Sequence, residues 1–334
     1  MNIIKSITAV AVCALAFTSC HNSDWEFDDY GHTTAYFAKQ APIRVVTLGE
    51  DDEANVELDN KHQFKLQATL AGIYKNKEDR KLKYVVDPTL LEGVDGVELL
   101  PTDYYTLEDP STLTIPAGAI IGGTVVTLND NFFNDPKSAK VNYVLPVRIV
   151  SAENVDSILE GHDYQLLAVT YKNKYAGLWC AETDDLWRVS EFLPNEKDRT
   201  FSRKYTDDLI TLTTVSLNTF SISKSYTILE KKWNEAEQKW ENKEVTRNLI
   251  FNCTVADNGE IVVSDAEGNQ VGTGKYAYHG IQDFTDAKRM ADYITLDYKV
   301  TLTSEIVEGT AEWHYECKGK YMLQSRGNKE ENWK

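Results

Sequence analysis

The 334-residue sequence lacks the short motifs that identify the common catalytic sites. It contains no HExxH zinc-protease motif, no GxSxG nucleophile motif, no Walker phosphate loop and no complete GxGxxG dinucleotide motif. Histidine, the most frequent general base, occurs only six times and is scattered along the chain. The sequence therefore predicts a protein that is not an enzyme of a familiar type and that needs no cofactor.

Cysteine is scarce, and its spacing fits no metal site. Five cysteines occur, and after Cys20 only Cys180, Cys253 and Cys317 remain. No CxxC pair or Cys/His spacing typical of structural zinc accompanies them, so we predict no metal. An odd number of cysteines is compatible with one disulfide and one buried thiol, or with three buried thiols.

Positive charge is in deficit, and long apolar runs are missing. Lys and Arg total 35 against 52 Asp and Glu, which gives a formal net charge of −17. A chain this acidic repels phosphate backbones, which excludes nucleic acid as a partner. The main apolar run, residues 7–17, is shorter than the roughly 20 residues that a membrane-spanning helix needs.

That apolar run leads into a candidate lipidation site. Lys5 precedes it, and the small residues Thr18 and Ser19 stand directly before Cys20. This order resembles a bacterial lipobox, in which a peptidase cuts before a cysteine whose thiol carries diacylglycerol; an ordinary signal peptide is the alternative. We predict a signal peptide over residues 1–19 and a membrane attachment through the lipid on Cys20 alone.

Residues 20–32 are acidic and show no periodicity. Such a segment is typical of a solvated tether between a membrane and a folded domain. An acidic stretch behind a lipidated cysteine also resembles the signal that sends lipoproteins of Bacteroidota to the outer face of the outer membrane. We therefore expect an outer-membrane lipoprotein that faces the cell exterior.

The remaining chain is long enough for two domains, and both have β patterns. Residues 33–172 contain about seven short strand patterns with little helical periodicity, which predicts an immunoglobulin-like β-sandwich. Residues 173–334 contain about eight more, joined by turns such as Asp-Asn-Gly at 257–259. This second series predicts an all-β antiparallel meander, most simply a lipocalin-like barrel, with a second sandwich as the alternative.

Part of the first domain resembles an uncharacterised N-terminal domain found in gut Bacteroidota. The likeness is carried by Pro-Thr-Asp-Tyr-Tyr at 101–105, Leu-Thr-Ile-Pro-Ala-Gly at 113–118 and Tyr-Val-Leu-Pro-Val-Arg-Ile at 143–149. That domain recurs in surface lipoproteins of polysaccharide-utilisation loci, some of which carry an endo-β-N-acetylglucosaminidase behind it. The resemblance implies a spacer or docking module that works beside an outer-membrane importer and its partner lipoproteins.

Two tryptophans in a highly charged segment, residues 230–241, are the strongest candidates for ligand contact. If the segment is a hairpin, Trp233 and Trp240 meet across its turn. Exposed indole rings could stack on sugar rings, and Asn234 and Gln238 could bond sugar hydroxyls. A cross-strand aromatic pair that stabilises the hairpin, or a short helix that packs both tryptophans on the barrel, would explain them without a ligand.

Trp187 is a second candidate, because Asp184, Asp185 and Arg188 stand close to it in the chain. Two carboxylates that act as acid and base must share one site. Adjacent residues of a strand point to opposite faces, so we do not expect Asp184 and Asp185 to form such a site.

These patterns predict a cell-surface lipoprotein that captures a glycan of unknown class without catalysis, for delivery to an outer-membrane importer. One different possibility is a structural or adhesin-type lipoprotein whose partner is a protein. Another is an enzyme of unfamiliar type in the C-terminal barrel.

Overall fold

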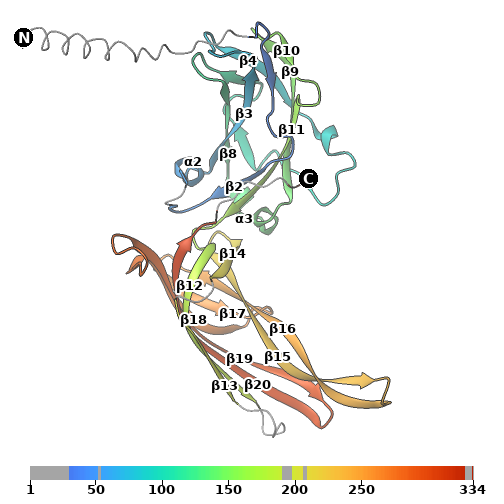
Figure 1. Ribbon diagram of the computed structural model, residues 1–334, viewed down its shortest axis with the longest axis vertical. Helices are drawn as coiled ribbons and strands as arrows, with labels where there is room; N and C mark the ends of the chain where they lie inside the picture. The colour runs from blue at the N-terminus through green and yellow to red at the C-terminus, as the bar shows by residue number, and fades with distance from the viewer. Residues whose placement is uncertain (1–29, 52–53, 190–197, 206–208, 328–332, 334) are drawn as a thin grey trace, which may run out of the picture.

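The computed structural model describes residues 30–51, 54–189, 198–205, 209–327 and 333. The predicted signal peptide, the lipidation site Cys20 and most of the tether lie outside these residues. Within the described chain, two β-domains are placed end to end (Figure 1), and no helix is long and apolar enough to cross a membrane. The prediction of an all-β fold is confirmed.

The first domain is a single sheet that curls onto itself into a half-barrel. Its elements are β1 (Thr34–Tyr36), β2 (Ile43–Thr47), α2 (Glu57–Asn60), β3 (Gln63–Ala71), β4 (Arg80–Val86), η1 (Pro88–Leu91), β5 (Glu98–Leu99), β6 (Tyr105–Leu107), β7 (Thr112–Ile115), β8 (Ile121–Leu128), α3 (Asp130–Asn134), η2 (Pro136–Ala139), β9 (Tyr143–Glu153), β10 (Ser157–Ile158) and β11 (Tyr164–Lys172). The strand order is β10-β1-β3-β8-β7-β4-β9-β11-β2. β1 pairs antiparallel with β3, whereas β2 pairs parallel with β11 near the other end of this order. The chain therefore crosses between the two layers just after β1.

Alternation of apolar and polar residues makes these strands two-faced. In β3, every second side chain from Phe64 to Leu70 is buried, and the intervening side chains are exposed or half-buried. The buried side chains of both layers form one continuous core. The burial of this core is the main term that stabilises the domain.

The second domain is the antiparallel meander expected from the sequence, closed into a ring rather than split into a second sandwich. Its strands are β12 (Gly177–Val189), β13 (Arg199–Arg203), β14 (Ile210–Ser216), β15 (Thr219–Asn234), β16 (Lys239–Val255), β17 (Glu260–Ser264), β18 (Gln270–Gln282), β19 (Met290–Ile306) and β20 (Gly309–Ser325). Consecutive strands pair from β14 to β20, and β20 pairs with β12 from Leu178 to Val189. That last pairing closes the barrel.

The barrel is fully closed only at the end nearest the first domain. There β12 pairs with β14 over residues 177–179, whereas farther along the same edge it pairs with β13. β14 follows β15 only as far as Ser221, so β13 and β15 face each other with no backbone pairing among the described residues. Beyond this level, the long hairpins β15–β16 and β19–β20 extend away from the first domain (Figure 1).

One side chain of the β15–β16 hairpin contacts the turn between β19 and β20. Asn242 donates a hydrogen bond to Glu308 Oε2 (2.9 Å) and accepts one from the Val307 backbone N–H (2.8 Å). Large apolar side chains, including Trp313 and Ile306, fill the space between the hairpins. The two hairpins therefore pack face to face as far as Asn242, and β15–β16 extends beyond this contact to its turn.

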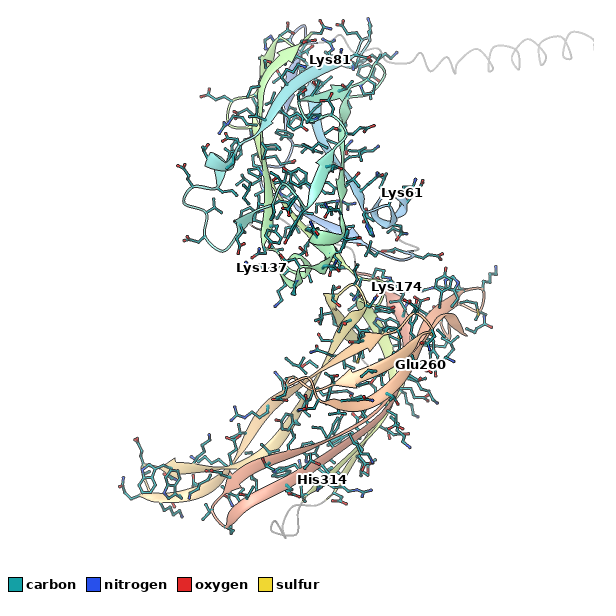
Figure 2. All side chains as sticks on the ribbon, turned by 180° about the vertical axis from the view of Figure 1, so that it is seen from behind. Lys61, Lys81, Lys137, Lys174, Glu260 and His314 are labelled. Carbon is teal, nitrogen blue, oxygen red and sulfur yellow. The ribbon has the colours of Figure 1, made fainter. Side chains whose placement is uncertain are left out.

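The junction between the domains is a four-residue linker held by two buried polar side chains. Asn173 donates to the carbonyls of Ser216 (2.7 Å) and Thr219 (2.8 Å), which ties the linker to the β14–β15 turn. Arg326 donates to the carbonyls of Glu50, Lys174 and Ala176, and thereby contacts both domains and the linker. Figure 2 shows Lys174 at this narrow connection.

The Arg326 guanidinium is nearly inaccessible to solvent, and its counter-ion is Asp292, 3.5 Å away and equally buried. Burial lowers the pKa of Arg326, and the charge of Asp292 opposes that shift. Asp292 also accepts hydrogen bonds from the Tyr276 hydroxyl (2.7 Å) and the His279 backbone N–H (3.0 Å). Removal of the arginine would leave this carboxylate buried without a cation.

We expect Arg326→Ala to lower the free energy of unfolding by about 3 kcal/mol, because an unpaired buried charge is costly. Urea unfolding of purified residues 21–334 measures the change. Lys320→Ala is the control, since Lys320 forms an exposed ion pair with Glu182 and should contribute at most about 1 kcal/mol. Equal effects of the two substitutions would contradict the proposed role of Arg326.

Candidate ligand-binding groove

A groove opens in the side of the barrel where β13 and β15 are not paired. It consists of two adjoining cavities of about 790 Å³ and about 260 Å³, which share Asp185, Phe201, Lys224 and Ser225. We call this feature the side groove. Its wide end adds small and polar residues such as Thr183 and Ser223, and its aromatic end adds Trp187, Tyr226 and Tyr315.

Strand alternation decides which side chains reach the side groove. On β12 the odd-numbered residues, including Asp185 and Trp187, face the interior, and on β15 the even-numbered residues, including Lys224 and Tyr226, do so. Asp184 consequently faces outward, where it accepts a hydrogen bond from Ser202 Oγ (2.9 Å). The two adjacent carboxylates lie on opposite faces of the sheet.

One ion pair bridges the two walls of the side groove. Lys224 Nζ on β15 lies 3.3 Å from Asp185 Oδ2 on β12, and both side chains are more than four-fifths buried. A charge-assisted contact in such a sheltered position is stronger than the same contact on a surface. It joins β12 and β15 where no backbone hydrogen bond does so.

Aromatic rings form the wall beside this ion pair. Trp187 is almost fully buried, and its ring centroid lies 5.6 Å from Tyr226, 5.7 Å from Tyr315 and 5.9 Å from Trp313. Phe201 stands at the rim with 56% of its surface exposed. The aromatic end therefore offers apolar ring faces next to a charged pair.

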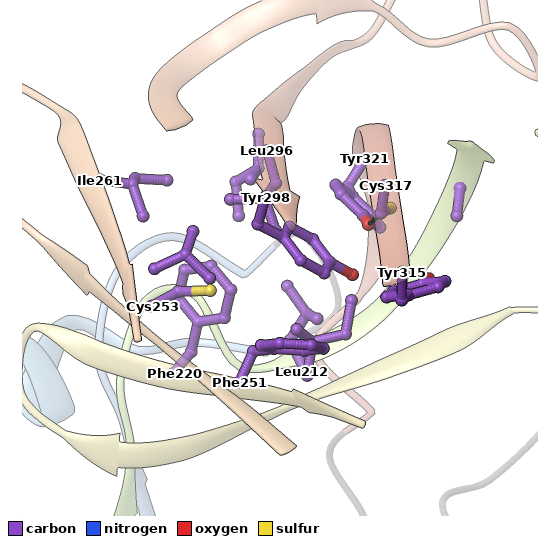
Figure 3. Packing of buried hydrophobic residues seen from close by; sticks show 14 of the residues in the cluster. Leu212, Phe220, Phe251, Cys253, Ile261, Leu296, Tyr298, Tyr315, Cys317 and Tyr321 are labelled. Atoms are coloured by element: carbon purple, nitrogen blue, oxygen red, sulfur yellow. Dashed lines mark hydrogen bonds between the residues drawn. The ribbon is translucent and has the colours of Figure 1, made fainter. Parts of the chain in front are cut away.

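Three buried polar side chains lie together below the aromatic wall, Asp185, Tyr298 and Tyr315, and the Tyr315 hydroxyl interacts with both of the others. They belong to neighbouring strands, because Cys317 on β20 pairs with Asp185 on one side and with Tyr298 on the other. Figure 3 shows the Tyr298 hydroxyl pointing toward Tyr315, with Cys317 close by. An unpaired buried polar group costs roughly 1–3 kcal/mol, and the contacts within this cluster reduce that cost.

The Tyr315 hydroxyl and the Cys317 thiol of this cluster are held in their protonated forms. Burial raises the pKa of the Tyr315 hydroxyl well above its usual value, and the nearby charges of Cys317 and Asp185 add to the shift. Burial likewise raises the pKa of Cys317 to about 11, with Asp185 as the second cause. Tyr315 therefore remains a hydrogen-bond donor at neutral pH.

The structure places the predicted hairpin residues far from the side groove. Trp233 and Trp240 are directly paired at the outer end of β15–β16, with ring centroids 5.4 Å apart and planes at 67°. Both are about half exposed, and Lys231 Nζ lies 4.9 Å above the Trp240 ring. This edge-to-face geometry is that of the cross-strand aromatic pair, and the helical alternative is wrong.

Asn234 and Gln238, the predicted sugar-bonding residues of the tip, are engaged in the turn itself. Asn234 Oδ1 accepts hydrogen bonds from the backbone of Ala236 and Glu237, and Gln238 Nε2 donates to the Glu235 carbonyl. Gln238 also has a positive φ of 53°, as tight turns require. Their geometry is explained by the hairpin turn alone.

Trp187 is the predicted residue that the structure brings to the groove, although it lies in a strand and not on a loop. Sequence reasoning missed Lys224, Tyr226, Phe201 and Tyr315. A signal for Lys224 was present, since a lysine stands at an inward position between Ile222 and Tyr226 in an otherwise apolar series. A charge in such a series indicates either a buried partner or a site.

The three cysteines of the described chain are free and buried, which fits the alternative of three thiols and not that of a disulfide. No group of three or more potential metal ligands occurs among the described residues. Burial raises the pKa of Cys253 to about 12, and it also raises the pKa of Cys180.

We expect Cys180, Cys253 and Cys317 to be unreactive in folded residues 21–334 at pH 8. A thiol with a pKa of about 11 is only roughly one part in 1,000 thiolate at that pH, and the thiolate is the nucleophile. A colorimetric disulfide reagent should detect no fast thiol in the native protein and three after denaturation in guanidinium. A fast native thiol would contradict the buried positions.

Comparisons with known proteins agree with this fold. A family model described as a "-like, N-terminal domain" matches residues 29–156. A Bacteroides ovatus structure of unknown function is 23% identical, covers 91% of this chain and 98% of its own, and superposes with a TM-score of 0.70. No curated protein sequence matches the chain.

A second solved structure, a Bacteroides thetaiotaomicron protein described as an auxiliary nutrient binding protein, is 13% identical and covers 84% of this chain and 90% of its own, with a TM-score of 0.44. The Bacteroides ovatus likeness extends over both domains. This chain is therefore similar to the Bacteroides ovatus protein in its complete two-domain fold.

Proposed function

We propose that this protein is a cell-surface lipoprotein that binds a glycan, without catalysis, in the side groove of its C-terminal barrel. One observation carries the proposal: a single opening combines accessible volume, aromatic ring faces and the Asp185–Lys224 ion pair. Binding sites for small molecules typically combine a mostly apolar lining with a few placed polar groups. The aromatic end of the side groove has this composition, whereas its wide end is lined mostly by polar residues.

Sugars match both kinds of surface in the side groove. The C–H face of a sugar ring suits the flat ring of Phe201 at the rim or of Tyr226 on the wall. Sugar hydroxyls both donate and accept, so they can bond either member of the Asp185–Lys224 pair that lines the same cavity. A purely apolar ligand would leave the Asp185–Lys224 pair without polar contacts.

The acidic residues of the side groove do not form a hydrolytic pair. Glycoside hydrolysis typically uses two carboxyl groups on either side of the scissile bond. Of the described residues that line the groove, Asp185 is the only one with a carboxyl group, and Lys224 pairs with it. The arrangement supports binding rather than cleavage.

The first domain would serve as a spacer between the membrane and the groove. Figure 1 places the beginning of the described chain at the end of the first domain that lies away from the barrel. A lipid on Cys20 would anchor that end, and the barrel would face outward. This position suits the capture of a glycan for an outer-membrane importer and its partner lipoproteins, as the resemblance of the first domain implies.

We expect purified residues 21–334 to bind one glycan class on an array of host and plant glycans. Phe201→Ala should weaken that binding about fivefold, because a stacked aromatic contact contributes roughly 1 kcal/mol. The matched control is Phe284→Ala, which removes a ring of similar exposure that stacks on Tyr205 outside the groove. If the folded protein binds none of the glycans on the array, the proposal is refuted.

The exposed Trp233–Trp240 pair favours a second candidate, a contact at the hairpin tip. Half-exposed paired indoles leave apolar surface in water at the far end of the barrel. Trp240→Ala, tested on the same array, distinguishes the two sites. If Trp240→Ala abolishes glycan binding and Phe201→Ala leaves it unchanged, the glycan site is at the hairpin tip. A stable protein partner without any glycan response would instead indicate the adhesin-type role.

We also expect lipid on Cys20. In cells, Cys20→Ser should abolish labelling by a radioactive fatty acid and release the protein from the membrane fraction, because the chain then has no acyl anchor. Cys13→Ser, within the apolar run, is the control and should leave both unchanged. Retention of lipid in the Cys20 variant would exclude the lipobox.

A further inference from the structure

We infer that the first domain contacts the lipid bilayer directly through the end at which the tether enters it. This inference goes beyond glycan binding, and it rests on the lipid that we predict on Cys20. We call the contact surface the tether end. It consists of four described segments, residues 30–33, 72–81, 116–121 and 153–156.

Hydrogen bonds join these four segments into one surface. They link Tyr30 with Gly72, Asn76 with Gly118, Asp79 with Asn154, and Thr33 with Asp156. Residues 72–81 thus contact each of the other three segments. Figure 2 shows Lys81, at the end of this segment, at the end of the first domain that lies away from the barrel.

The turn between β7 and β8, residues 116–121, is apolar. Its sequence is Pro-Ala-Gly-Ala-Ile-Ile, which contains no side chain that can form a hydrogen bond with water. Ile120 and Ile121 are 49% and 51% exposed, and no other two consecutive residues of the described chain are both large, apolar and exposed. A single exposed isoleucine is ordinary, whereas a run of exposed apolar residues in a turn indicates a contact surface.

This turn is held in one conformation by the neighbouring loop. Gly118 has a positive φ of 85°, and its N–H donates to the Asn76 carbonyl (2.7 Å). Asn76 Nδ2 donates to the Pro116 carbonyl (2.9 Å), and Asp79 Oδ1 accepts from the Ala117 N–H (2.9 Å). The exposure of the apolar side chains is therefore a fixed feature of the fold.

Tyrosine and lysine residues accompany the apolar turn. Tyr30 and Tyr74 are 93% and 54% exposed. Tyrosine is enriched where a membrane meets water, because its ring is apolar and its hydroxyl is polar. Lys75 and Lys77 follow Tyr74 in the same loop, and a lysine can extend its amine toward lipid phosphates while its stem covers apolar surface. This combination is typical of a surface that lies at the level of lipid headgroups.

The tether end is neutral, although the whole chain has a formal net charge of −17. Its four basic residues, all within 72–81, balance its four acidic residues, Glu78, Asp79, Glu153 and Asp156. An anionic bilayer surface attracts basic segments and repels acidic ones over a Debye length. The tether end can therefore approach such a surface without the repulsion that the rest of this acidic chain would experience.

The position of the lipidation site identifies the bilayer as the partner. Ten peptide units join Cys20 to Tyr30, and they can span at most roughly 35 Å. A link this short keeps the tether end at a high local concentration next to the membrane. A modest apolar contact is then sufficient to hold the first domain against the lipid.

The test uses the full lipidated chain in vesicles of phosphatidylethanolamine and phosphatidylglycerol that contain a nitroxide-labelled lipid. A fluorophore is attached to Ala117→Cys in the apolar turn, and the native thiols of the described chain are buried and should not react. We expect the nitroxide to quench this fluorophore. The matched label on Ala266→Cys, in the exposed β17–β18 turn of the barrel, should remain unquenched.

A substitution in the turn tests the apolar contact itself. Ile120→Ser should lower the equilibrium constant for the contact about fivefold, which equals about 1 kcal/mol. Ile250→Ser is the matched control, because Ile250 on β16 is also 49% exposed, and it should leave the quenching at position 117 unchanged. Both variants should retain the thermal unfolding midpoint of the parent protein, since both side chains are half in solvent.

Three outcomes overturn the inference. They are equal quenching of the two labels, quenching at position 117 that survives Ile120→Ser, and an unquenched turn together with a protein partner that Ile120→Ser releases. If Cys20 carries no lipid, the inference fails with that prediction. Glycan binding is measured on unlipidated residues 21–334, so the proposed function stands or falls independently of these results.

Discussion

The pairing of β12 with β20 is the interaction on which the C-terminal domain depends. It joins the first and last strands of the meander, and it occupies one whole edge of β12. The other edge of β12 pairs with β14 over residues 177–179 and with β13 over residues 183–187. Among the described residues β13 has no pairing with β15, so it does not continue the ring. Closure of the barrel at one end and opening of the side groove are therefore two consequences of the same strand pairing.

The two-residue period of a strand then determines the contents of the groove. A one-residue shift of β12 against β20 would turn Asp185 and Trp187 to solvent and bring Asp184 and Arg188 inside. The register is fixed because Trp179 and Ala181, on the same face, are fully buried in the barrel core. The core thus holds the functional side chains in position, although it does not contact a ligand itself.

The fold was accessible from the sequence, and the site was only partly so. Strand alternation and tight turns are local patterns, and they predicted an all-β chain with a meander in its second half. The site depends on contacts between distant residues: Lys224 and Asp185 are 39 positions apart, and the β12–β20 pairing joins both ends of the domain. No local pattern encodes which strands close a ring, so only Trp187 among the groove residues was identified in advance.

The contrast between the two tryptophan sites shows which observation carries more weight. Exposure drew attention to Trp233 and Trp240, yet a cross-strand pair at the end of a hairpin stabilises that hairpin whether or not a ligand is present. Trp187 is buried, and its significance comes from its position beside the Asp185–Lys224 ion pair at the wall of an open cavity. A charged pair and aromatic ring faces that line one cavity are therefore a stronger indication of a binding site than exposed aromatic rings alone.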